Sequence, residues 1–174
     1  EQRNDVTAEE YLEMIRLKTA VLLAASLKIG ARLGGASVED ADRLYDFGMH
    51  IGVAFQLKDD LLDVYGNAKV FGKNIGGDIL CNKKTYMLIK ALEHANADQH
   101  NQLNSWINAE TFQPAEKIAA VTELYDRIGV KAVCENKILE YSNRAMESLA
   151  AVSIAEEKKE ELKKIIENLI HREV

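Results

Sequence analysis

Proline, cysteine and aromatic residues are scarce in this chain. Among its 174 residues there are 1 Pro, 10 Gly and 2 Cys, and only 6% are aromatic. Because few residues break helices and long stretches are rich in Ala, Leu, Glu and Lys, the composition predicts an all-α fold. Cys81 and Cys134 lack the spacing of metal ligands, so we expect reduced thiols in a cytoplasmic protein.

Basic residues are fewer than acidic ones, and no long apolar run is present. The chain has 22 Lys and Arg against 28 Asp and Glu, a formal charge of −6. Without a basic stripe to replace phosphate counterions, nucleic acid is excluded as the main partner. The longest apolar run, residues 20–27, is far shorter than the roughly 20 residues of a membrane span. We therefore expect one all-α domain over residues 1–174, without a membrane span.

Capping signals and glycines divide the chain into helices. Residues 7–10 have the spacing of a capping box, and Gly34 and Gly35 suit a helix end. Residues 66–82, rich in Gly and Lys, predict a loop or a broken helix. The expected helices cover residues 8–32, 38–65, 84–95, 99–108, 114–127 and 130–150, with a last one capped by residues 153–156.

Three carboxylates stand in a strongly apolar stretch of the second predicted helix: Asp59, Asp60 and Asp63. Helical spacing puts them on one side, where they repel one another and raise their own pKa values unless a cation binds. Val70 stands where a calcium loop needs a bidentate Glu, which excludes that motif. Hard oxygen ligands of this kind suit Mg²⁺, so the pattern predicts a metal-bridged phosphate or diphosphate site.

Lysines accompany this acidic cluster. Lys73, Lys83 and Lys84 follow it in the chain and can supply the positive charges that a diphosphate needs. A P-loop is excluded, because the spacing is one residue too long and Asn74 replaces the required hydroxyl. Lys18 stands at the edge of an apolar helix, where snorkelling to solvent is the simplest explanation from the residues alone.

Taken together, several segments resemble the trans-type polyprenyl diphosphate synthases, a family that includes farnesyl and geranylgeranyl diphosphate synthases. These segments are residues 18–20, 55–63, 72–73, 77–78 and 82–86. The likeness is strong over residues 8–95 and extends beyond them in helical character only. It implies an all-α bundle, the isoprenoid-synthase fold, whose members condense an allylic diphosphate with isopentenyl diphosphate by using Mg²⁺.

The resemblance also implies roles for individual residues. Asp59 would ligate Mg²⁺ directly, with Asp60 and Asp63 in or just behind its coordination shell. Three ammonium groups would contact the allylic diphosphate: those of Lys18, Lys73 and Lys83. Thr19 and Gln56 would face the allylic cation through oxygen atoms, and with Lys18 they form the expected catalytic set.

One departure from the family limits these expectations. The family carries two aspartate-rich motifs, whereas this chain has one, so we expect the C-terminal portion of a synthase without its N-terminal helices and first motif. The intact parent is expected to be a homo-oligomeric prenyltransferase, and the 174 residues alone to be inactive and to self-associate. Two alternatives stay open: a non-catalytic subunit of a prenyl synthase, and a class I terpene cyclase, whose usual second motif is not evident.

Overall fold

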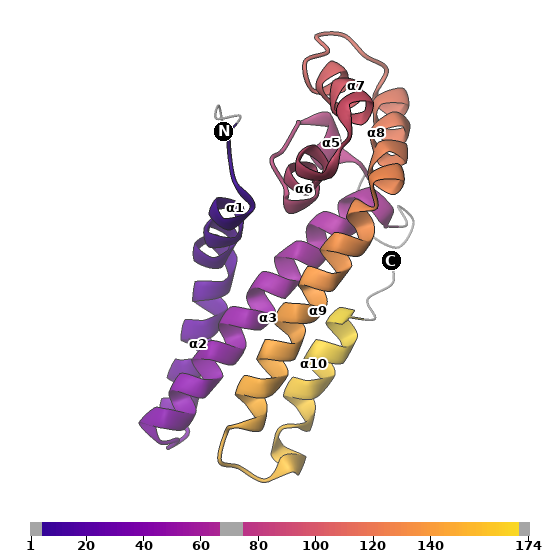
Figure 1. Ribbon diagram of the computed structural model, residues 1–174. Helices are drawn as coiled ribbons and strands as arrows, with labels where there is room; N and C mark the ends of the chain where they lie inside the picture. Colours follow the sequence, from indigo (N-terminus) through magenta and orange to yellow (C-terminus); the bar gives the residue numbers. More distant parts are fainter. Residues whose placement is uncertain (1–4, 67–74, 171–174) are drawn as a thin grey trace. The chain divides into compact units, whose positions relative to one another are not determined.

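The computed structural model describes residues 5–66 and 75–170. All regular structure within these ranges is helical (Figure 1), which confirms the predicted all-α fold. Its elements are α1 (Ala8–Ile15), the π-helical turn η1 (Arg16–Ala20), α2 (Val21–Leu33), α3 (Val38–Tyr65), α5 (Gly77–Leu80), α6 (Tyr86–His94), α7 (Ala97–Ile107), α8 (Pro114–Ile128), α9 (Val130–Ala150), the 3-10 turn η2 (Glu156–Lys158) and α10 (Glu160–Ile170).

The described residues form two compact units. Unit 1 contains residues 5–11, 59–66 and 75–135, and unit 2 contains residues 12–58 and 136–170. Helix α3 therefore contributes its first 21 residues to unit 2 and its last seven to unit 1. The expectation of a single domain stays a prediction. No helix in the described ranges is both long enough and apolar enough to cross a bilayer.

Most helix boundaries agree with the sequence predictions. The expected capping box is present: the Glu10 amide donates to Thr7 Oγ1 (3.1 Å), and the Thr7 amide donates to Glu10 Oε2 (2.9 Å). Helices α3 and α9 have the predicted limits. The first predicted helix is instead three consecutive segments, because residues 16–20 form a π-helical turn. Such turns are rare and are frequent at functional sites.

Small residues bring two helical segments of unit 2 into close contact. A Cβ atom on Gly48 would lie 2.6 Å from the Cα of Ala24, and one on Gly52 would lie 2.6 Å from the Cα of Ala20. Ala20 is the last residue of the π-helical turn. Because Gly52 has no side chain, the backbone of α3 lies directly against the last residue of the turn.

One predicted cap is wrong. Ser153 does not cap the last helix, which begins at Glu160 after the 3-10 turn. Instead, the Ser153 amide donates to Asp40 Oδ1 (2.9 Å), and the Ser153 hydroxyl accepts from the Arg43 guanidinium (3.3 Å). Residues of α3, distant in the sequence, thus use the polar groups that a local cap would need.

In unit 1, helix α8 packs against α5, α6 and α7 (Figure 1). Helix α7 begins two residues earlier than predicted, because Asn96 and Gln99 form a capping box. The single proline, Pro114, occupies the first turn of α8 as predicted. Thr85 caps α6, and its hydroxyl accepts from the Leu88 amide (3.4 Å). This group of helices surrounds the segment that carries Lys83.

Candidate functional site

The three predicted metal-ligating carboxylates lie in the last two turns of α3, within unit 1. Asp60 is the buried one, with 2% of its surface exposed, whereas Asp59 and Asp63 are half-buried. Asp59 and Asp63 are four residues apart, so they share a face of the helix. Within the described ranges the Asp59 carboxylate makes no hydrogen bond or ion pair.

Asp60 is held by two partners from distant parts of the chain. The Tyr11 hydroxyl of α1 donates to its Oδ2, and the Lys83 ammonium lies 3.0 Å from its Oδ1. Burial raises the pKa of the Asp60 carboxyl, although both partners oppose this change. Burial and the neighbouring carboxylate likewise raise the pKa of Tyr11, so the phenol stays protonated and acts as the donor. These contacts make Asp60 a well-anchored buried group.

Asp63 connects α3 to the short helix α5. Its Oδ2 accepts from the Asp78 amide (2.9 Å), and its backbone carbonyl accepts from the Gly76 amide (2.6 Å). Gly76 has φ 84°, a conformation that favours glycine and that turns the chain into α5. Burial raises the pKa of the Asp63 carboxyl, with the Asp78 amide opposing. The other carboxylate oxygen, Oδ1, lies beside Gly77, where an added Cβ atom would be 3.4 Å from it, an ordinary contact distance.

Lys83 lies between two carboxylates. Its Nζ is 2.7 Å from Asp78 Oδ2 and 3.0 Å from Asp60 Oδ1, and 41% of the side chain is exposed. Burial alone would lower the pKa of Lys83, but the hydrogen bonds and negative charge of Asp78 and Asp60 raise it. The ammonium therefore remains charged at neutral pH, with part of its surface open to a ligand.

The predicted catalytic residues outside this cluster belong to unit 2. Lys18 and Thr19 lie on the π-helical turn η1, where Lys18 is exposed and Thr19 is half-buried. The Thr19 hydroxyl donates to Gln56 Oε1 of α3 at 3.2 Å. The structure thus joins Thr19 to Gln56, while Lys18 is exposed.

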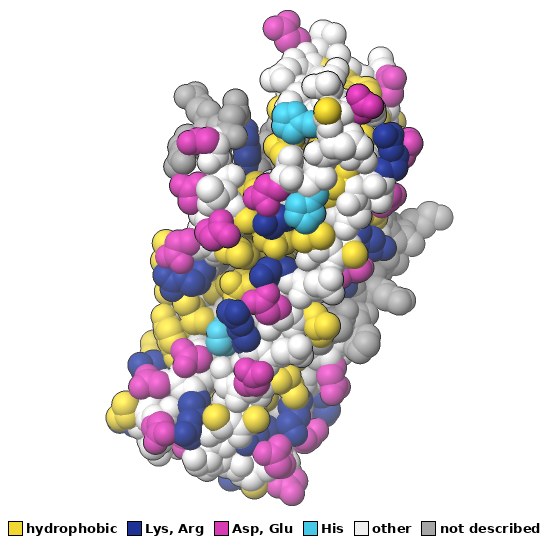
Figure 2. All heavy atoms as spheres, viewed as in Figure 1, with side chains coloured by type: hydrophobic (Ala, Val, Ile, Leu, Met, Phe, Trp, Pro, Cys, Tyr) yellow, Lys and Arg dark blue, Asp and Glu magenta, His cyan; other side chains and the backbone are white. Residues whose placement is uncertain are grey.

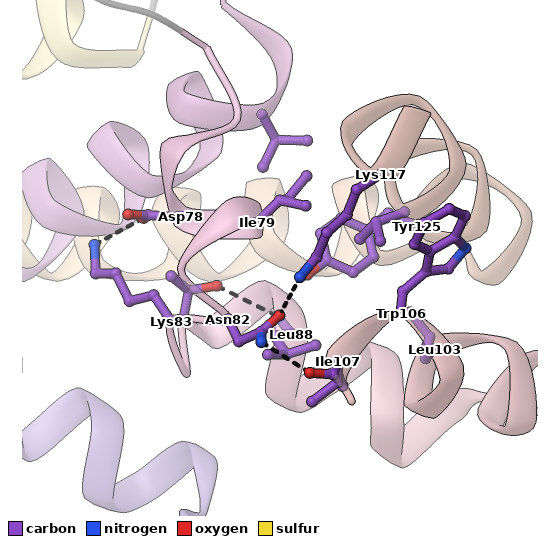
Figure 3. Close-up of a pocket in the computed structure, with 13 residues that line it drawn as sticks. Asp78, Ile79, Asn82, Lys83, Leu88, Leu103, Trp106, Ile107, Lys117 and Tyr125 are labelled. Atoms are coloured by element: carbon purple, nitrogen blue, oxygen red, sulfur yellow. Dashed lines mark hydrogen bonds and ion pairs between the residues drawn. The ribbon is translucent and has the colours of Figure 1, made fainter. Parts of the chain in front are cut away.

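A small cavity lies next to Lys83, between α5, α6, α7 and α8. It offers about 20 Å³ for the centre of a water molecule. Polar side chains at its wall include Asn82, Lys117 and Thr85, and Trp106 and Tyr125 contribute apolar surface (Figure 3). A space of this size holds about one water molecule and no organic substrate. It is therefore part of the support of the site.

Sequence reasoning located part of this cluster and missed part. Asp60, Asp63 and Lys83 come together as expected, whereas the predicted diphosphate contact Lys73 lies outside the described residues. The sequence patterns predict no role for Tyr11 or Asp78. The signal for Tyr11 was a tyrosine on the apolar face of the first helix, since a buried hydroxyl needs a partner.

The carboxylates of unit 1 are the candidate ligands for Mg²⁺. Within the described residues, no group of three or more His, Cys, Asp and Glu side chains is arranged to hold a metal ion. Mg²⁺ usually needs only one or two protein carboxylates and completes its octahedron with water and substrate phosphate. Asp59, which has no partner among the described residues, and the second oxygen of Asp63 fit that requirement chemically. Asp60, engaged with Tyr11 and Lys83, fits a supporting position behind them.

Comparison with known proteins defines the class to which this fold and cluster belong. The profile of the Polyprenyl synthetase family matches residues 1–125. The chain is also 37% identical over 173 residues to the short chain isoprenyl diphosphate synthase of Methanothermobacter thermautotrophicus, a match that covers 99% of this chain and 52% of the relative. The chain therefore belongs to the polyprenyl synthetase family, which confirms the resemblance of its motifs.

Solved structures agree with this assignment. A geranylgeranyl pyrophosphate synthase superposes with a TM-score of 0.91 at 35% identity, over 99% of this chain and 54% of the other. The enzyme of Corynebacterium glutamicum, solved as a complex with isoprenyl diphosphate and magnesium, superposes with a TM-score of 0.85 at 30% identity over 95% of this chain and 47% of the other. The chain spans about half the length of the relatives that it matches.

Proposed function

We propose that the chain carries the allylic-diphosphate side of a Mg²⁺-dependent prenyl diphosphate synthase site. The observation that carries this proposal is that the three aspartates differ in their burial and in their hydrogen-bond partners. Asp60 is buried and engaged, which leaves Asp59 and one oxygen of Asp63 on a shared helix face. Two carboxylates with one nearby ammonium match what a metal-bound diphosphate requires.

Each residue then has a role in breaking the allylic C–O bond. The electron pair of this bond passes to the diphosphate oxygen, so negative charge grows on the leaving group. Lys83 donates to that group, as Lys18 and Lys73 are also proposed to do. When bound to Asp59 and Asp63, Mg²⁺ would neutralise further charge as a Lewis acid. Tyr11 and Asp60 hold the Lys83 ammonium in position while the charge develops.

Thr19 and Gln56 are proposed to face the allylic cation. Their hydrogen bond fixes the Gln56 side chain and directs the hydroxyl proton of Thr19 toward Gln56. The lone pairs of Thr19 Oγ1 then remain available to stabilise positive charge. Water would capture a carbocation, so the proposal requires that water be excluded while the cation exists. Isopentenyl diphosphate as the second substrate, and a homo-oligomeric whole protein, complete the proposal.

The experiment measures Mg²⁺-dependent condensation of labelled isopentenyl diphosphate with allylic diphosphates by the whole protein. We expect Asp59→Asn to lower kcat by about 100-fold or more, because a group that stabilises developing charge is lost. Asp42→Asn is the matched control, since Asp42 is exposed on α3 and pairs only with Lys28 in the described structure. We also expect chelation of Mg²⁺ to abolish turnover, and the 174 residues alone to be inactive.

Several results would contradict this proposal. Full turnover by Asp59→Asn would remove the assigned role of the carboxylate. Condensation by the isolated 174 residues would disprove their expected inactivity. An inactive whole protein that raises the turnover of a separate synthase would support the alternative of a non-catalytic subunit.

A further inference from the structure

Asn82, the residue before Lys83, has an unusual backbone conformation. Its φ is 50°, and no other non-glycine residue in the described ranges has a positive φ. Asn tolerates this left-handed region better than most residues, but the conformation still needs support from its surroundings. Since Lys83 follows directly, the conformation of Asn82 sets the direction in which the Lys83 side chain leaves the turn after α5.

The side chain of Asn82 is held at both ends. Its Nδ2 donates to the carbonyl of Ile107 (2.9 Å), and its Oδ1 accepts from the Lys117 ammonium (2.8 Å; Figure 3). Ile107 is the last residue of α7, so its carbonyl lacks a partner within that helix. Asn82 is thus fixed to both α7 and α8.

Lys117 is an unexpected residue in this position. It lies in the first turns of α8 with only 1% of its surface exposed, and its ammonium is 4.2 Å from the centre of the Phe112 ring. Burial lowers the pKa of Lys117, and no carboxylate pairs with it in the described part of the chain. Burying an ammonium beside one neutral amide is costly, and an apolar residue would fill the same space at lower cost.

We propose that Lys117 is a positioning residue that acts on the diphosphate site through Asn82. Its ammonium holds the Asn82 amide, Asn82 keeps its left-handed conformation, and Lys83 is thereby placed between Asp60 and Asp78. Figure 3 shows Lys83 and Lys117 extending to opposite sides of Asn82, so Lys117 acts without touching the ligand. The inference rests on the proposed function for the role of Lys83 in binding a diphosphate.

A double-mutant cycle in the 174-residue chain tests this inference. Isothermal titration calorimetry with Mg²⁺ and inorganic pyrophosphate gives the Kd for wild type, Lys117→Met, Lys83→Met and the double variant. We expect Lys117→Met to weaken binding by about tenfold, comparable to losing one hydrogen bond to a charged group. In the Lys83→Met background the same change should have no further effect, because the residues act in series.

Two further variants of unit 1 complete the experiment, a control at Lys90 and a second test at Asn82. Lys90→Met removes another largely buried lysine, on α6, which pairs with Glu93, and should leave the Kd unchanged. If circular dichroism shows that Lys117→Met does not fold, Asn82→Gly decides, since glycine accepts the φ but lacks the amide. An unchanged Kd in the variant that folds, or equal weakening with and without Lys83, overturns the inference.

Failure of the proposed function would be distinguishable from failure of this inference. If the wild-type chain does not bind pyrophosphate, the proposed site of unit 1 loses its support. Hydrogen exchange then tests the positioning role through two backbone amides. The Lys83 amide donates to the Asp78 carbonyl (3.0 Å), and the Thr85 amide donates to the Lys83 carbonyl (2.8 Å). We expect Lys117→Met, but not Lys90→Met, to accelerate their exchange at least tenfold. Unchanged exchange overturns the inference.

Discussion

The two units use polar groups in different ways. In unit 1 a buried carboxylate, Asp60, is bonded to a phenol and an ammonium, and Asp63 is bonded to a backbone amide. In unit 2 the comparable residues Thr19 and Gln56 share one hydrogen bond of 3.2 Å, and Lys18 is exposed. The carboxylates of unit 1 thus have charged and phenolic partners, whereas Thr19 and Gln56 of unit 2 share a hydrogen bond between neutral groups.

The carboxyl groups of the two units also differ in their pKa values. Burial raises the pKa values of Asp60 and Asp63 in unit 1. In unit 2 the Ser153 amide, aided by Arg43, lowers the pKa of Asp40, and Lys159 and Lys163 lower that of Glu156 to about 2. The environment in unit 1 therefore disfavours the charged form of both carboxyl groups, which is typical of sites that bind cations.

The largest expected effect is that of Asp60→Ala on unit 1. The substitution leaves the buried Tyr11 hydroxyl without its acceptor and removes one of the two carboxylates beside Lys83. We expect a loss of about 2 to 3 kcal/mol in the free energy of unfolding. In unit 2, Gln56→Ala should cost no more than about 1 kcal/mol.

Urea unfolding measures this difference with a separate probe for each unit. Fluorescence of Trp106, the single tryptophan, reports on unit 1, and the ring signals of His50 in nuclear magnetic resonance report on unit 2. Asp60→Asn is the matched variant, since it keeps an acceptor for Tyr11 and should lose less stability. Equal losses for Asp60→Ala and Gln56→Ala would remove the contrast between the units.

The helices were predictable because their signals are local. Capping residues, glycines and apolar spacing act over a few positions, which is why α3 and α9 have the expected limits. The π-helical turn was not predicted; its last residue, Ala20, lies against Gly52, and a contact between residues so far apart in the sequence leaves no local signal. The failed cap at Ser153 has a similar cause, since Asp40 binds its amide.

The candidate site was likewise predictable where its signals are local, and not where it depends on tertiary contacts. The acidic and lysine motifs identified Asp60, Asp63 and Lys83, since carboxylates in an apolar helix require partners. Which aspartate would be buried could not be read from the spacing, because the rotation of α3 is set by packing. Lys117 carried no signal at all, and its importance depends on the tertiary contact with Asn82.

A smaller effect is expected from pH, with opposite signs in the two units. Asp40 has a lowered pKa in the folded state, so its stabilisation is complete above its ordinary value of 3.8 and is lost as the pH falls through the folded-state pKa. Asp60 has a raised pKa, so its contribution is greatest below 3.8 and decreases as the pH rises through the folded-state pKa.

Unfolding in metal-free buffer, followed through Trp106 and His50 between pH 2.5 and pH 7, measures this effect. We expect acid to destabilise unit 2 relative to unit 1 over the lower part of this range. Asp40→Asn should reduce the acid loss in unit 2, to which Glu156 also contributes, and leave the unit 1 profile unchanged. Parallel profiles for the two probes would contradict the opposite signs.

The smallest effect on stability is expected at the apolar surface of unit 2. Leu22, Ile29 and Leu33 on α2 are 75%, 59% and 85% exposed, and Figure 2 shows apolar side chains grouped at the left of the view, where Figure 1 has α2. Since these side chains are already in water, Leu33→Ser should change the free energy of unfolding by less than about 0.5 kcal/mol. The same substitution should weaken self-association, because exposed apolar groups of this size favour contact with another surface.

Sedimentation velocity over a range of concentrations measures this self-association, with Glu161→Ser on α10 as a surface control. Equal association of wild type and Leu33→Ser would show that this face of α2 is not the contact.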